Sequence, residues 1–151
     1  MLDPTWFLVM ASALAVIGGV LVYKQSVSQL AECASEEEFL SRRPQAYLRF
    51  FVKFVVVEFV SLPFLIYGMY QIVSGMAGST DVTYQLLAVV LTLLFGVLSV
   101  YFTSSQIVKD PNVSDMMKKY AIHHMILGLG LIHAFPVVSL AFLFGALFGL
   151  Y

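Results

Sequence analysis

The sequence predicts an all-α membrane protein whose four transmembrane helices form two tandem helical hairpins. Of its 151 residues, 60% are hydrophobic and only 11% are charged, which lies outside the usual composition of a water-soluble domain. Four apolar runs are each long enough, at about 1.5 Å per residue, to cross a hydrocarbon core of ~30 Å. These runs are Trp6–Tyr23, Phe54–Val73, Tyr84–Phe102 and Met125–Leu150.

The first run begins close to Met1 but has no basic segment before it and no obvious small-residue cleavage site after it. We therefore expect a retained helix rather than a cleaved signal peptide. Small residues recur at every fourth position, at Ala11, Ala15 and Gly19. This spacing places them on one helix face and favours close packing of another helix there.

The second run contains Glu58, the only acidic residue within the four runs, and Pro63 five residues later. An ionised, unpaired carboxylate is unfavourable in lipid, so Glu58 should be protonated or paired. Ser61 is expected on the same helix face, where it could donate a hydrogen bond to Glu58. The alternative is an interfacial position, because Lys53 lies only roughly 7 Å away along the helix. Ser35 and Glu38 have the spacing of a capping box, which predicts that this helix begins outside the membrane. Ser114 likewise precedes a helical run that leads into the fourth apolar run.

A short segment without basic residues leads to the third run, where Ala88, Thr92 and Gly96 repeat the four-residue spacing of the first. The repeat predicts that the first and third helices form a closely packed inner layer. The chain therefore divides into a first hairpin at 1–77 and a second at 78–151.

The fourth run contains His133 in an otherwise apolar stretch, followed by Pro136. A proline frees the carbonyl four residues earlier, here that of Ile132. Two interpretations of His133 remain open: a neutral imidazole bonded to a neighbouring carbonyl or hydroxyl, or a functional group that relays protons with Glu58 or replaces a lost carboxylate. His123 and His124 are expected to be interfacial. No cluster with metal-ligand spacing is present in the sequence.

All eight lysines and arginines flank two connections, 24–53 and 103–119. The positive-inside rule predicts that these loops are cytoplasmic and that both termini lie outside. The basic residues are few and follow the topology, so we expect no nucleic-acid partner. The single Cys33 has no partner for an internal disulfide.

The run Met125–Phe142 resembles the second helix of the proteolipid c subunit of rotary ATP synthases, whose motif reads apolar–Glu–Ala–Leu–Pro–apolar. His133-Ala134-Phe135-Pro136 stands on that motif, with His133 at the carboxylate position. In the first hairpin, Arg42-Arg43-Pro44 resembles the family's loop motif, and Glu58 stands at the carboxylate position.

A duplicated hairpin with one carboxylate is similar to the four-helix, vacuolar-type proteolipid. The resemblance implies a homo-oligomeric ring in the lipid bilayer that turns against stator-like and central-stalk-like subunits. Glu58, with Ser61, would bind and release H+ or Na+, and His133 would mark a degenerate ion site. No cofactor other than the transported ion is implied.

The leading hypothesis is thus a rotor-like proteolipid subunit that is not itself an enzyme, because the sequence has no nucleotide-binding motif and no nucleophile–base pair. The main alternative is a small four-helix scaffold or accessory subunit of a larger membrane complex. A weaker alternative is a membrane-embedded enzyme or transporter that uses Glu58 and His133 as a proton pair.

Overall fold

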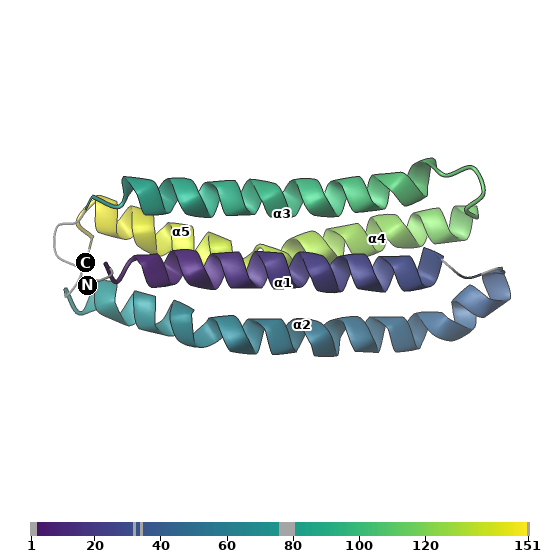
Figure 1. The fold of residues 1–151 in the computed structure, drawn as a ribbon, viewed down its shortest axis with the longest axis horizontal. Helices are drawn as coiled ribbons and strands as arrows, with labels where there is room; N and C mark the ends of the chain where they lie inside the picture. Colours follow the sequence, from purple (N-terminus) through teal and green to yellow (C-terminus); the bar gives the residue numbers. More distant parts are fainter. Residues whose placement is uncertain (1–2, 32, 34, 76–80, 151) are drawn as a thin grey trace.

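A computed structural model describes residues 3–31, 33, 35–75 and 81–150, and all regular structure in these ranges is helical. The helices run along one common direction and form an elongated bundle (Figure 1). These described residues contain four candidate membrane spans, with the last two helices counted as one span. The predicted fold class is therefore confirmed: the chain is a multi-pass helical membrane protein. The helices are α1 (Trp6–Ala31), α2 (Glu36–Val73), α3 (Thr83–Lys109), α4 (Asp115–Ile132) and α5 (Ala134–Leu147).

Side-chain caps begin α2 and α4 where the sequence predicts helix starts. The Ser35 hydroxyl accepts a hydrogen bond from the Glu38 amide at 3.2 Å, and the Ser114 hydroxyl accepts one from the Met117 amide at 3.4 Å. Each cap satisfies an amide that has no partner within its helix. The helices therefore extend beyond the apolar runs.

The basic segments 24–53 and 103–119 contain the ends of the helices as well as the connections between them. Both segments are largely helical, because α1 ends at Ala31, α2 starts at Glu36 and α3 continues to Lys109. Pro44 and Pro63 both lie inside α2, which continues through them as one helix. The fourth run, by contrast, is divided at His133 into α4 and α5.

Helix α1 packs against each of the other helices in the described part of the chain. Its small-residue face is buried, with Ala11 and Ala15 inaccessible or nearly so. A Cβ atom added at Gly19 would lie 2.7 Å from Ile132 Cγ1 and 3.1 Å from Phe54 Cε2. The small residues of α1 therefore allow α2 and α4 to approach it closely, as the spacing predicts.

The two hairpins share one core rather than forming separate units. One buried cluster combines Val16 and Phe54 of the first hairpin with Val100 and Ile132 of the second. The predicted boundary between residues 77 and 78 lies outside the described residues.

Buried hydrogen bonds also connect the two hairpins. The hydroxyl oxygens of Ser12 and Ser139 lie 2.9 Å apart, and Gln85 Nε2 donates to Thr5 Oγ1 at 3.0 Å. The hydroxyls of Tyr23 and Ser104 form a further bond. Polar side chains inside a membrane bundle need such partners, because lipid provides none.

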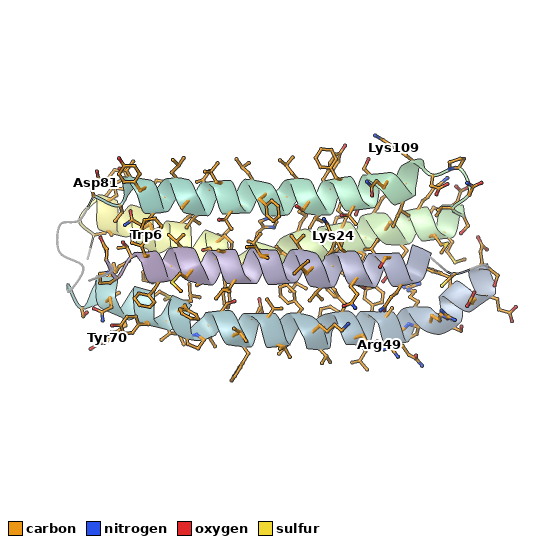
Figure 2. The ribbon with its side chains drawn as sticks, viewed as in Figure 1. Trp6, Lys24, Arg49, Tyr70, Asp81 and Lys109 are labelled. Atoms are coloured by element: carbon orange, nitrogen blue, oxygen red, sulfur yellow. The ribbon has the colours of Figure 1, made fainter. Side chains whose placement is uncertain are left out.

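The two ends of the bundle differ in charge. Figure 2 shows Lys24, Arg49 and Lys109 toward one end and Trp6, Tyr70 and Asp81 toward the other. We call the first the basic end. Helix α1 begins and α5 ends at the opposite end (Figure 1).

Candidate functional site

Glu58 lies on α2 at the edge between its buried and exposed faces. The adjacent Phe59 is 75% exposed, and most other neighbouring residues on this face are exposed and apolar. Among the described residues, the Glu58 side chain makes no hydrogen bond or ion pair. In a bilayer this surface meets lipid, so the neutral acid is the form accommodated without a partner from another chain.

The depth of Glu58 can be judged from its neighbours. Lys53, five residues earlier, donates to Gln25 Oε1 at 2.7 Å at the basic end. Val57 packs against Gly18 of α1, which lies six residues before Lys24, or roughly 9 Å along the helix. The carboxyl group is therefore displaced from the basic end toward the membrane interior.

Ser61 is fully buried, and its hydroxyl donates to the Val57 carbonyl at 2.9 Å. The predicted hydrogen bond to Glu58 is therefore not formed, because the single hydroxyl proton is used within α2. A serine inside a helix commonly makes this bond to the carbonyl four residues back. Its role as an ion ligand stays a prediction.

His133 lies at the break between α4 and α5 and is only 9% exposed. Its Nδ1 lies 2.6 Å from the Leu129 carbonyl oxygen, and its Nε2 lies 3.2 Å from the Leu93 carbonyl oxygen of α3. A neutral imidazole has one N–H and donates to only one of these acceptors, whereas an imidazolium can donate to both. Either form has a backbone partner, as the structural interpretation of His133 expects.

The structure does not bring Glu58 and His133 into hydrogen-bond contact. Both ring nitrogens of His133 face backbone carbonyls, and Glu58 has no polar partner among the described residues. The two residues do lie at similar depths, because Phe54 and Ile132 meet at Gly19. A proton relay between them would need water or a second chain.

Gly96 provides the space that His133 occupies between the helices. A Cβ atom at Gly96 would lie 2.8 Å from His133 Nε2 and 2.9 Å from Val16 Cγ1. This glycine therefore lets α1, α3 and the imidazole meet at one point. It belongs to the stripe of small residues that recurs every four positions on the third helix.

Replacing His133 with Leu is expected to lower the free energy of unfolding by about 1 kcal/mol, the scale of one interhelical hydrogen bond in a membrane protein. His123→Leu is the matched control, because His123 Nδ1 also lies 2.8 Å from a carbonyl four residues back, that of Lys119, but His123 is exposed. Denaturant unfolding in detergent would measure both variants. Equal losses of stability would contradict an interhelical role for His133.

His124 is a polar residue enclosed within the bundle. It is fully buried, and neither ring nitrogen has a hydrogen-bond partner among the described residues. Its expected depth at the membrane interface stays a prediction. It stacks on Tyr23 and Tyr120, with ring centroids 5.3 and 5.4 Å away, and contacts the edges of two more rings. These rings belong to Tyr47 and Phe50 of α2.

The sequence contains a pattern that is consistent with the aromatic surroundings of His124. Tyr120 and His124 are four residues apart on α4, and Tyr47 and Phe50 are three apart on α2, so each pair shares a helix face. The pattern alone does not show that these faces of α4 and α2 pack against each other. His123, in contrast, is exposed.

The described residues contain no group of three or more His, Cys, Asp or Glu side chains placed to hold a metal ion. Within the apolar runs, the Glu58 carboxyl group has no described polar partner, whereas the His133 imidazole is held by backbone carbonyls.

The fold and these residues define a four-span helical membrane protein with a half-buried carboxyl group beside an exposed apolar surface. No protein-family model, curated protein or solved structure matches the chain.

Proposed function

We propose that the chain is an ion-translocating subunit of the rotor-proteolipid type, in which Glu58 carries H+ or Na+. The observation that carries this proposal is the position of Glu58, a carboxyl group without a described partner at the outer edge of α2. A carboxyl group at the lipid-facing surface can exchange an ion with a second protein that moves past it. As such a subunit, the chain performs no catalytic step itself.

Further support comes from the apolar sides of the bundle. Exposed valine, leucine and phenylalanine side chains cover the outer faces of α2 and α3, where neighbouring copies in a ring could pack. The resemblance of His133-Ala134-Phe135-Pro136 to the proteolipid motif points the same way, with His133 as a degenerate site.

We also propose that the basic end of the bundle faces the cytoplasm. The lysines and arginines gather at this end, and the positive-inside rule relates such a bias to orientation. Both termini would then lie outside. Accessibility of cysteines introduced at each end would test this orientation.

Copy number tests the rotor proposal most directly. Native mass spectrometry of the detergent-purified protein is expected to give one large multiple of the 16.8 kDa chain. A membrane-soluble carbodiimide, which reacts with protonated carboxyl groups, is expected to modify Glu58 in preference to the acids at the aqueous ends. A monomer or small oligomer, or labelling that avoids Glu58, would contradict the proposal.

One observation favours the second candidate, a scaffold or accessory subunit of a membrane complex. The small residues of α1, which could otherwise pack against a neighbouring copy, are used inside the chain against α2 and α4. Under this proposal, native mass spectrometry would find the chain together with unrelated subunits, and Glu58 would contact one of them.

A further inference from the structure

A groove of about 470 Å³ lies between α2 and α4 at the basic end of the bundle. Arg43 from α2 and Lys119 and His123 from α4 contribute to its lining, and no described acidic residue does. The groove thus combines several basic side chains in a concave surface between two membrane helices.

The nearby acidic residues leave these basic groups available. Glu38 pairs with Arg42 at 2.8 Å, and Asp115 approaches Lys118 at 3.9 Å. Arg43 and Lys119 make no ion pair with any described residue. Their charges can therefore be neutralised by a bound anion.

Aromatic rings hold the Arg43 side chain in place. Its guanidinium carbon lies 5.9 Å from the ring centre of Tyr47 and 5.8 Å from that of Tyr120. Both distances lie within the range of a cation–π contact, and such a contact leaves N–H groups of the guanidinium to bind an anion. An arginine held in this way loses less conformational entropy on binding than a freely moving one.

The groove is apolar where it continues toward the membrane interior. Ile126 and Leu127 line this part and are 61% and 41% exposed. They lie seven and eight residues beyond Lys119, which is roughly 10–12 Å along α4. A ligand that fills the groove should therefore have an anionic head and an apolar tail.

We propose that this groove binds an anionic phospholipid, with the headgroup phosphate on Arg43 and Lys119 and an acyl chain along Ile126 and Leu127. Basic pockets between membrane helices are suited to such headgroups. His123 adds a further donor when protonated, because its Nδ1 is bonded to the Lys119 carbonyl and its Nε2 is left available. The proposal does not depend on ion binding by Glu58, which does not line the groove.

Native mass spectrometry in detergent tests the proposal by titration with phosphatidylglycerol, phosphatidylcholine or inorganic phosphate. We expect one saturable phosphatidylglycerol per chain and much weaker binding of phosphatidylcholine. The double variant Arg43→Gln/Lys119→Gln should raise the dissociation constant for phosphatidylglycerol roughly 30-fold, because each basic group near a membrane contributes substantially to binding. Lys24→Gln/Arg49→Gln is the matched control, since it removes the same charge at the same end outside the groove.

A second variant keeps the basic side chains of the groove but fills its apolar part. Leu127→Trp should weaken phosphatidylglycerol binding, and the exposure of Leu127 makes this change compatible with folding. Equal binding of phosphatidylcholine, or equal effects of the two double variants, would overturn the proposal. Displacement of phosphatidylglycerol by inorganic phosphate at similar concentration would instead indicate a soluble anion and would overturn the lipid assignment.

Discussion

Replacing Glu58 with Gln is expected to abolish ion translocation while leaving assembly and stability unchanged. The amide has nearly the same shape as the acid but cannot release a proton or carry the charge that binds Na+. Stability should change by less than about 0.5 kcal/mol, because the half-buried side chain has no described polar partner to lose. Translocation would be measured in membrane vesicles from cells that contain the chain with its natural partners, and assembly by native mass spectrometry.

Two further variants make the Glu58 experiment decisive. Glu58→Asp keeps a carboxyl group and should retain part of the activity. His133→Ala should leave translocation measurable, since both ring nitrogens face backbone carbonyls. If Glu58→Gln retained full activity and His133→Ala abolished it, the ion site would have to be reassigned to His133. Loss of assembly in Glu58→Gln would favour the scaffold function instead.

Replacing Gly96 with Leu is expected to lower the free energy of unfolding by about 1–3 kcal/mol, the usual effect of overfilling a well-packed core. The first atom of the new side chain would already lie 2.8 Å from His133 Nε2 and 2.9 Å from Val16 Cγ1. To remove this steric overlap, α3 would have to move away from α1. That movement would weaken the hydrogen bond between His133 and the Leu93 carbonyl. Denaturant unfolding in detergent measures the loss.

Gly130→Leu is the matched control for Gly96→Leu. A Cβ atom at Gly130 would meet nothing within 4 Å, so a leucine there has open space. This change should be neutral or slightly stabilising, because glycine is a poor helix former. Similar losses at both glycines would show that helix propensity or membrane insertion, rather than packing at His133, controls the stability.

Much of the fold follows from local sequence. An apolar run of sufficient length predicts a membrane span wherever it occurs, because its burial in lipid does not require a particular neighbour. The caps at Ser35 and Ser114 could likewise be predicted, since each bond joins residues three apart. The lengths of the connections were less predictable, because polar sequence can continue a helix into water.

The candidate site was only partly predictable. Glu58 and His133 are identifiable as ionisable residues in apolar runs, but their partners depend on the packing of distant segments. Ser61 illustrates this limit: it shares a helix with Glu58, yet its hydroxyl bonds to Val57. The spacing of Ser61 and Glu58 allowed their interaction but did not require it.

By itself, the sequence determined the membrane class, the spans, the small-residue faces and the residues that begin α2 and α4, because each depends on interactions within one helix or with lipid. Only the tertiary structure decided that His124 is enclosed by aromatic rings, that His133 bonds to Leu93, and that Arg43 and Lys119 share a groove. These contacts join residues tens of positions apart. Which helix faces meet is set by the fit of all side chains together, which no single helix specifies.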